Sequence, residues 1–157
     1  MTKLTFLGTA SAVPDKDHHN THFILESPDR AILVDCSGNP VVRLSQMDID
    51  PLNLTDIVLT HFHPDHVSGL PLLLMDLWLL GREKKLNIFG LQDVIKRTKK
   101  MMDLYEWQDW RDFYPVIFHG LNDEEKISLI DTDQTKLWAF PVCHMIPGIG
   151  LKITLSE

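Results

Sequence analysis

Apolar and polar residues alternate in short runs along the first part of the chain, a pattern typical of β-strands. Residues 3–7 alternate in this way and end at Gly8, which marks a turn. Two further runs, residues 21–27 and 30–36, meet at the turn sequence Ser27-Pro28-Asp29. Because Ser, Pro and Asp favour tight turns, we expect these two runs to form an antiparallel hairpin.

Helical segments and a fully apolar strand follow in the middle of the chain. Residues 39–47 predict a short helix, with Asn39 as its N-cap and Pro40 at its first position. The continuous apolar run of residues 57–59 predicts a strand that is covered on both faces. Residues 67–81 are strongly apolar and end in a glycine, so they predict one buried helix.

The remaining residues predict one more strand and helix and then a series of strands. Residues 86–90 predict a short strand, and residues 91–105 have helical spacing. A short helical or irregular connection is expected at residues 106–113. The last four expected strands cover residues 115–120, 126–131, 135–144 and 150–155.

The order of these elements defines the expected fold class. We predict an α/β (α+β) fold with a mixed β-sheet of about eight strands and about three helices, because strands and helices do not alternate strictly. So few helices leave one face of the sheet bare. A bare apolar face on a folded chain implies a partner surface, either a second copy of the chain or another segment.

Length and hydropathy narrow the class of protein. The chain has 157 residues, which suits a single domain. No stretch reaches the roughly 18 consecutive apolar residues of a membrane helix. The first residues have the pattern of a strand and lack the apolar core of a secretory signal. We therefore expect a cytoplasmic protein with no membrane partner.

The charge balance bears on nucleic-acid binding. The net charge of −7 gives no general attraction to a polynucleotide. One segment departs from this balance, because residues 84–100 hold a cluster of basic side chains. The cluster consists of Lys84, Lys85, Lys96, Arg97, Lys99 and Lys100. We interpret it as a solvated helix face, with an RNA-binding patch as the alternative.

The sequence HFHPDH at residues 61–66 places four potential metal ligands directly after an apolar strand. In an extended segment alternate side chains share a side, so His61 and His63 form a pair. Asp65 and His66 fall where the next helix begins, close to that pair. The segment can therefore offer two ligands to one ion and two to a second. Two such ions can clamp a phosphoryl group and activate water.

This cluster resembles the H-x-H-x-D-H signature of the metallo-β-lactamase superfamily. The opening FLGTASAVPDKDHHN, at residues 6–20, is similar to the N-terminal strand and loop of the ribonuclease Z branch, whose members cut tRNA 3′ trailers. The segment HMIPGIGLKI, at residues 144–153, resembles the part of that branch in which a further metal-binding His precedes a Pro and a Gly-containing strand. The resemblance covers nearly the whole chain.

The resemblance implies a metallo-β-lactamase-like αββα sandwich and a set of site residues. His61, His63 and His144 would hold one Zn²⁺, and Asp65 and His66 would belong to a second ion, with Mn²⁺ as another candidate metal. Asp65 would also act as the general base. The implied activity is that of a metal-dependent hydrolase, a phosphodiesterase or endoribonuclease that uses zinc-bound hydroxide in tRNA 3′ processing.

The chain also departs from the pattern of the branch. No His or Asp follows His144, although relatives carry further ligands in their second half. Pro64 stands where Gly is common. We therefore expect residues 1–157 to be the first half of such a domain, incomplete at the C-terminus. Three explanations fit the missing ligands. The chain is a cut fragment, it pairs as a homodimer or with a missing second half, or it is a stand-alone half that holds one ion.

Two rival functions stay open at this stage. A half-domain that binds metal or a partner chain without catalysis fits the missing ligands. A hydrolase of small phosphodiesters or sulfate esters fits the acidic charge balance better than an RNA substrate does. Among the other polar residues, we expect Asp35 to support a ligand histidine. We expect His22 and His119 to be structural.

Overall fold

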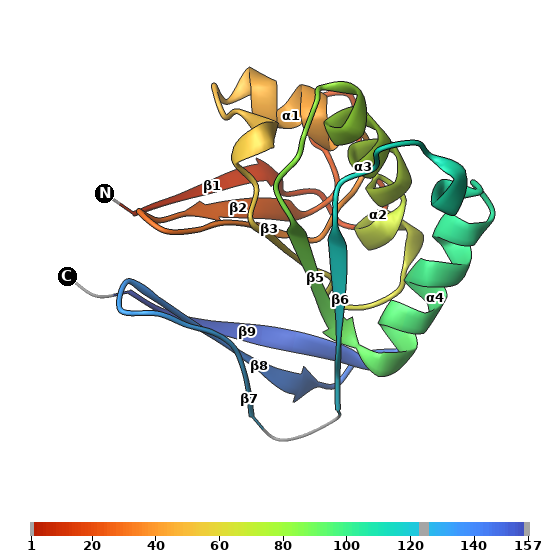
Figure 1. The fold of residues 1–157 in the computed structure, drawn as a ribbon. Helices are drawn as coiled ribbons and strands as arrows, with labels where there is room; N and C mark the ends of the chain where they lie inside the picture. Colours follow the sequence, from red (N-terminus) through yellow and green to blue (C-terminus); the bar gives the residue numbers. More distant parts are fainter. Residues whose placement is uncertain (1, 123–125, 156–157) are drawn as a thin grey trace.

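The computed structural model describes residues 2–122 and 126–155 and arranges their strands in two sheets (Figure 1). The larger sheet has the order β1-β2-β3-β4-β5-β6, antiparallel from β1 to β3 and parallel from β3 to β6. Its strands are β1 Lys3–Gly8, β2 His22–Glu26, β3 Ala31–Val34, β4 Asp56–Val58, β5 Leu86–Leu91 and β6 Val116–Leu121. The smaller, antiparallel sheet consists of β7 Ile127–Asp131, β8 Thr135–Val142 and β9 Gly148–Leu155.

The helices lie together on one face of the larger sheet, and the smaller sheet lies on the other side (Figure 1). The helices are α1 Pro40–Gln46, α2 Pro64–Val67, α3 Leu70–Leu79 and α4 Gln92–Asp103, with short 3₁₀ turns at Pro51–Asn53 and Trp107–Asp109. This layering confirms the predicted mixed α/β class. None of the described helices combines the length and the apolar character needed to cross a membrane.

Several local predictions are confirmed. Strands β2 and β3 form the expected hairpin. The Asn39 side chain caps α1 by accepting a hydrogen bond from the Val42 N–H at 3.2 Å, and Pro40 occupies the first turn. Gly81 follows α3 with φ +81°, a left-handed conformation that glycine adopts without steric cost. These contacts fix where the helices begin and end.

The single buried helix predicted within residues 67–81 is confirmed as α3, but it begins later than predicted, at Leu70. Gly69 separates α2 from α3, and its N–H donates to the Cys36 carbonyl at 2.9 Å. A Cβ at Gly69 would lie 2.8 Å from the Gly38 carbonyl oxygen. The break therefore lets this segment pack closely against the turn that follows β3, which hydropathy alone does not encode.

The last three strands form a sheet of their own. The order of the elements predicted a single sheet, whereas the αββα sandwich implied by the resemblance has two, as observed. Along β8, Leu137 and Ala139 are buried against the larger sheet, whereas Lys136 and Phe140 point outward and are exposed. No helix in the described ranges covers this outer face (Figure 1). The uncovered face that the small number of helices predicted thus lies on the smaller sheet.

The carboxyl ends of the central strands meet the loop between β8 and β9. The Leu59 N–H, just after β4, donates to the Phe89 carbonyl of β5 at 2.8 Å. The Ile149 N–H of β9 donates to the Thr60 carbonyl at 3.0 Å, which ties the smaller sheet to the same loop. The segment that contains the HFHPDH cluster therefore lies at the junction of the two sheets.

Candidate metal centre

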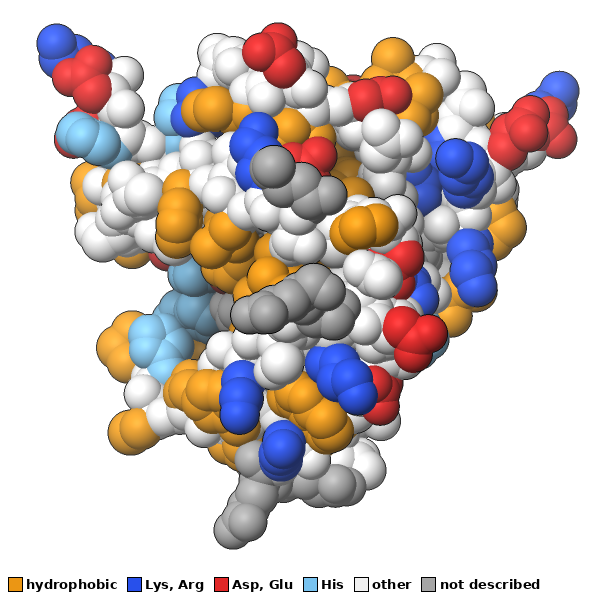
Figure 2. Space-filling view, turned by 90° about the vertical axis from the view of Figure 1, so that its left-hand side faces the viewer, with side chains coloured by type: hydrophobic (Ala, Val, Ile, Leu, Met, Phe, Trp, Pro, Cys, Tyr) orange, Lys and Arg blue, Asp and Glu red, His pale blue; other side chains and the backbone are white. Residues whose placement is uncertain are grey.

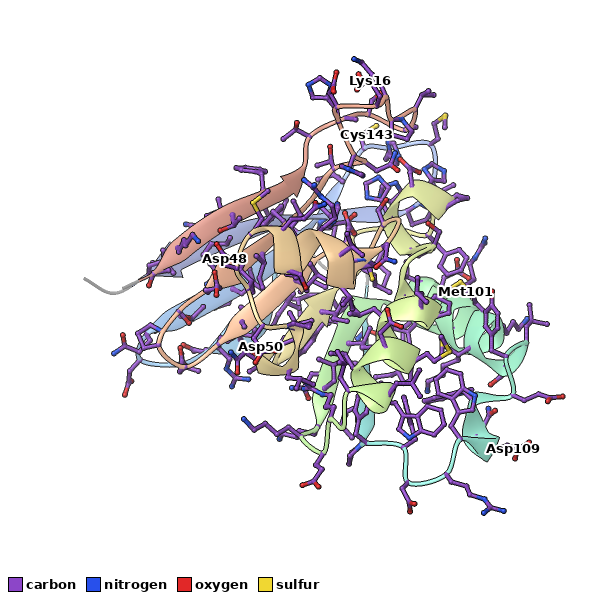
Figure 3. The ribbon with its side chains drawn as sticks, turned by 90° about the horizontal axis from the view of Figure 1, so that it is seen from above. Lys16, Asp48, Asp50, Met101, Asp109 and Cys143 are labelled. Carbon is purple, nitrogen blue, oxygen red and sulfur yellow. The ribbon has the colours of Figure 1, made fainter. Side chains whose placement is uncertain are left out.

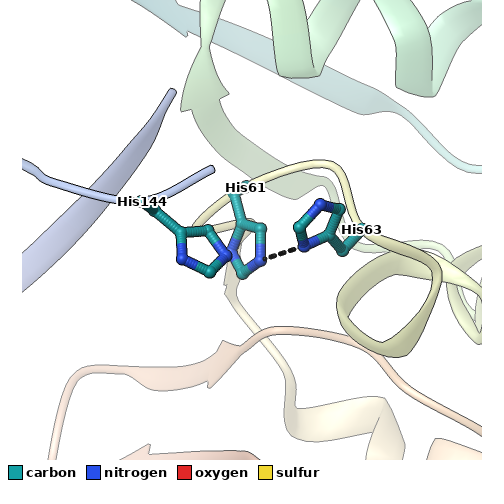
Figure 4. Close-up of side chains that lie close together, drawn as sticks. All are labelled: His61, His63 and His144. Carbon is teal, nitrogen blue, oxygen red and sulfur yellow. Dashed lines mark hydrogen bonds between the residues drawn. The ribbon is translucent and has the colours of Figure 1, made fainter. Parts of the chain in front are cut away.

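Three histidine side chains converge at this junction (Figure 4). His61 and His63 come from the loop after β4, and His144 comes from the loop between β8 and β9. One ring nitrogen from each lies within 4.8 Å of the other two. His61 Nε2 and His63 Nδ1 are 3.1 Å apart, and the His61 and His144 ring centroids are 4.6 Å apart. The structure thus brings together residues that are far apart in the sequence.

The geometry of this histidine trio fits a tetrahedral metal site. Zinc–nitrogen bonds of about 2.0–2.1 Å place neighbouring ligand nitrogens of a tetrahedral site roughly 3.3 Å apart. The closest pair already has this separation, so small side-chain rotations would bring the third nitrogen into range. Three imidazoles form a donor set typical of zinc, and they leave a fourth position for water or substrate.

Hydrogen bonds orient His61 for this role. The Thr60 hydroxyl lies 2.9 and 3.0 Å from the two carboxylate oxygens of Asp35, to which it can only donate. The same hydroxyl lies 3.0 Å from His61 Nδ1 and therefore accepts the proton of that nitrogen. The lone pair of His61 is then on Nε2, which faces His63. Burial, and then the nearby charge of His66, lower the His61 pKa to about 4, so the ring is neutral at pH 7.

Asp35 connects the histidine trio to His66. Its carboxylate accepts hydrogen bonds from the Thr60 N–H at 2.8 Å and from His66 Nδ1 at 2.6 Å. The residue is buried and has φ +61°, in the left-handed region that Asp tolerates better than most residues. Asp35 thus contacts the His66 ring directly and the His61 ring through Thr60, as expected of a residue that supports a candidate ligand histidine. These contacts fix the orientation of two rings at once.

Asp65 and His66 form an adjoining pair at the start of α2. Asp65 Oδ2 and His66 Nε2 are 3.4 Å apart, and the His66 ring centroid is 4.0 Å from that of His61. Burial opposes the positive charge of His66, but its hydrogen bond to Asp35 and the negative charges of Asp35 and Asp65 raise its pKa overall. His66 Nδ1 is held by Asp35, and its Nε2 lies against the Asp65 carboxylate, with the His66 ring beside that of His61. Two ligands are fewer than a closed site requires.

Two residues of the centre carry no sequence signal of their own. Thr60 precedes the cluster and acts only through Asp35 and His61. Gly148 opens β9, and a Cβ there would lie 3.3 Å from the Cβ of His61. The absence of a side chain lets β9 pack against the ligand loop. Neither role could be found from spacing, because both depend on contacts between the two sheets.

The centre opens to the surface. His61 is 8% exposed, whereas His144 is exposed at the rim. A cavity of about 230 Å³ lies between the ligand loop and the β8–β9 loop, and histidine side chains gather in a hollow on this face (Figure 2). Lys16, in the loop after β1, and Cys143 lie at the same edge of the molecule (Figure 3). Solvent and a small ligand can therefore reach the histidines.

The other histidines lie outside this group. His22 is buried with its Nδ1 2.8 Å from the Asn20 carbonyl oxygen. His119 stacks on Phe89 in the larger sheet with ring centroids 4.4 Å apart. These contacts agree with the structural roles predicted for both. His18 lies in the exposed loop and pairs with Asp15.

Comparison with known proteins places this geometry in a family. Residues 2–114 match the family model described as "Anti-Pycsar protein Apyc1". The chain belongs to the Apyc1 family. Within this family assignment, the chain is also 32% identical to the ribonuclease Z of Methanococcus maripaludis strain C5 over 94% of its length and 46% of the relative's. It is 30% identical to the ribonuclease Z of Methanocaldococcus jannaschii over 93% of its length and 45% of that relative.

Solved structures agree on the fold of this Apyc1-family chain. The short form of human tRNase Z matches with a TM-score of 0.84 at 24% identity, over 99% of this chain and 65% of that one. The metallo-β-lactamase fold protein YhfI from Bacillus subtilis matches with a TM-score of 0.76 at 17% identity, over 98% and 57%. The expected resemblance to the ribonuclease Z-like branch of the metallo-β-lactamase superfamily is confirmed. The chain spans about half the length of the curated relatives.

Proposed function

We propose that this chain carries the metal-binding half of a ribonuclease Z-like, metal-dependent phosphodiester hydrolase that acts on tRNA 3′ ends in the cytoplasm. The observation that carries the proposal is the convergence of His61, His63 and His144, with Asp65 and His66 beside them. The names of the relatives, ribonuclease Z and tRNase Z, support RNA as the substrate.

In this proposal the histidine trio holds one Zn²⁺, and Asp65 and His66 contribute to a second ion, with Mn²⁺ as the alternative metal. A bound ion would supply positive charge that makes water more acidic and stabilises the charge developing on the phosphoryl oxygens. Asp35 and Thr60 hold the rings of His66 and His61 in the orientation that this binding needs. They do so before any ligand arrives, which limits the entropy lost on binding.

The proton transfer is assigned to Asp65. Its carboxylate takes a proton from the attacking water while the water oxygen forms a new bond to phosphorus. The bond from phosphorus to the leaving oxygen breaks, and that oxygen takes a proton from solvent. Asp65 is partly exposed at the start of α2, so water can reach it.

The half-length match supports a further part of the proposal. We propose that residues 1–157 correspond to the first half of the metallo-β-lactamase-like domain of the relatives. The remaining ligands of the second ion would then come from a second half or from another copy of the chain. The uncovered outer face of the smaller sheet supports such a partner.

Hydrolysis and metal content test the proposal together. The purified chain is loaded with zinc or manganese and assayed with bis(p-nitrophenyl) phosphate, a sulfate ester and a tRNA precursor with a 3′ extension. We expect at least one ion per chain and cleavage of the phosphodiesters. His61→Ala should lose the ion and Asp65→Asn should lose activity, whereas His18→Ala, in the exposed loop, should match the unmodified chain. Less than one ion per chain, unchanged by His61→Ala, would contradict the proposal.

A second function is favoured by the same half-length match. The chain would bind metal or a partner chain without catalysis, because the second ion has only two ligands among the described residues. A folded dimer that holds metal but cleaves none of the three substrates with excess zinc would support this alternative over the hydrolase.

A further inference from the structure

Helix α4 begins beside the candidate metal centre. It follows β5 directly, and β5 pairs in parallel with β4, so that Val58 lies opposite Phe89. The loop after β4 carries His61 and His63. Because the carboxyl ends of β4 and β5 lie at the same edge of the sheet, the start of α4 and the ligand loop are neighbours (Figure 1).

One arginine of α4 contacts the ligand loop itself. The Arg97 guanidinium carbon lies 6.0 Å from the ring centroid of Phe62, the residue between His61 and His63. Arg97 Nε also donates to Asp93 Oδ2 at 2.7 Å, one turn earlier on the helix. An exposed cation is thus held next to the candidate ligands by an aromatic ring and a carboxylate.

The exposed face of α4 is basic. Lys96, Lys99 and Lys100 are exposed, and no carboxylate within the described ranges lies within ion-pair distance of their ammonium groups. The helix holds two acidic residues, Asp93 and Asp103, against four basic ones. In a chain with net charge −7, this face is therefore a local positive surface next to the metal centre.

The chemistry of the face selects the kind of partner. Lys96 and Lys100 are one turn apart, about 6 Å along the axis, and the twelve-residue helix is about 18 Å long. Among the apolar side chains of α4, Val94, Ile95 and Met102 are buried and Met101 is partly buried, so the helix lacks the continuous exposed apolar stripe that insertion into a lipid bilayer needs. A row of cations without an exposed apolar stripe is suited to a phosphodiester backbone.

We propose that the basic face of α4 binds the backbone of the RNA strand that flanks the cleaved bond. This inference rests on the proposed function and adds the surface that would select a polynucleotide over a small diester. The acidic remainder of the molecule repels RNA, so the strand is directed to the basic face of α4 beside the metal centre.

The test is RNA binding measured without added metal. A fluorescein-labelled twelve-nucleotide single-stranded RNA is titrated with the unmodified chain and with the double variant Lys96→Glu/Lys100→Glu, and anisotropy is recorded from 50 to 200 mM salt. We expect at least tenfold weaker binding for the variant at 50 mM salt. The slope of log affinity against log salt should fall by about 1.4, as expected for the loss of two phosphate contacts on a single strand.

The control carries the same charge change elsewhere. Lys84→Glu/Lys85→Glu alters the turn before β5, at the opposite end of that strand, and should weaken binding less than threefold. Circular dichroism shows whether the two glutamate variants fold. If either one does not, the glutamine variants Lys96→Gln/Lys100→Gln and Lys84→Gln/Lys85→Gln are used in their place. Equal weakening in both double variants, or no RNA binding by the unmodified chain, overturns the inference.

Hydrolysis of bis(p-nitrophenyl) phosphate separates this inference from the proposed function. The small diester does not extend to α4, so the α4 variant should keep the unmodified kcat/KM while RNA binding falls. A chain that binds RNA through α4 but cleaves no diester with metal would support the inference and contradict the hydrolase. A chain that cleaves the diester while both double variants bind RNA equally would support the hydrolase and contradict the inference about α4.

Discussion

At the scale of single residues, the carboxylate of Asp35 is the feature on which the orientation of the centre depends most. It accepts hydrogen bonds from the Thr60 backbone, the Thr60 hydroxyl and the His66 ring, all at 3.0 Å or less. It holds these contacts from a left-handed backbone conformation (φ +61°). The residue that positions the ligands is therefore itself fixed by its backbone and by burial.

Replacing Asp35 should weaken metal binding without unfolding the chain. Asp35→Asn keeps the size and the tolerance of a positive φ, but it removes the negative charge opposite His66. Outer-shell substitutions of this kind typically reduce metal affinity by about 10–100-fold. Competition with a chromophoric chelator measures the affinity. Asp48→Asn, at another aspartate with positive φ, is the control and should retain the unmodified affinity.

Buried His22 should make the metal-free chain sensitive to acid. Burial is the largest cause that lowers its pKa below the usual 6.5. As pH falls below about 6.5, the unfolded chain takes up a proton at this residue and the folded chain does not, so stability falls, by at most about 1.4 kcal/mol per pH unit. His22→Gln should show a shallower loss of unfolding free energy between pH 6.5 and 5 in urea titrations with a chelator present. Parallel curves for the two proteins would contradict this account.

The residue-scale prediction from sequence succeeded where spacing alone decides the geometry. The segment at residues 61–66 predicts that the His61, His63 and His66 rings lie close together, because a strand end and a helix start determine which side chains share a side. Their roles as metal ligands stay a prediction. The resemblance groups His144 with His61 and His63, and its ring does lie beside theirs. Thr60 and Gly148 were not predicted, because their roles arise only when β9 packs against the ligand loop.

At the scale of elements, the loop that follows β1 depends on a close backbone approach at Gly8. The nearest atoms to a Cβ at this position are backbone atoms of His19 and Asn20, at distances that real side chains do not show. Gly8→Ala should therefore force the loop away from β1 and cost about 1–3 kcal/mol of unfolding free energy, by chemical denaturation.

Gly120→Ala is the matched control on β6. The three atoms nearest to a Cβ there all belong to the end of the Gln92 side chain, which can rotate away at the cost of one hydrogen bond to the Gly120 carbonyl. We expect a loss of less than about 1 kcal/mol. An equal loss of unfolding free energy in both variants would show that the close backbone contact at Gly8 does not make this position more sensitive than Gly120.

Element boundaries were less predictable than element types. The strands and helices fall close to the predicted ranges, because alternation and helical spacing reflect burial directly. The late start of α3, at Leu70 within the predicted range 67–81, and the separation of β7–β9 into their own sheet both depend on tertiary contacts. The Gly69 approach to Gly38 and the Ile149 contact with Thr60 join segments far apart in the sequence, and hydropathy patterns carry no information about them.

At the scale of the whole molecule, a bound ion would link the two sheets. His61 and His63 follow a strand of the larger sheet, and His144 belongs to the smaller one. A ligand that binds only the folded state stabilises it by about 2.7 kcal/mol when its concentration is 100 times Kd. Zinc should therefore raise the Tm by about 5–10 °C in scanning calorimetry. His144→Ala should reduce this shift, while His119→Ala should retain it.

The central claim is that the rings of residues 61, 63 and 144 coordinate one cation. X-ray absorption spectroscopy at the zinc edge, on the chain loaded with one equivalent of zinc, counts the imidazoles bound and their distances. We predict three imidazole nitrogens at about 2.0–2.1 Å, and two for the chain with His144→Ala. A spectrum without imidazole scattering, or one that the substitution at residue 144 leaves unchanged, would contradict the account.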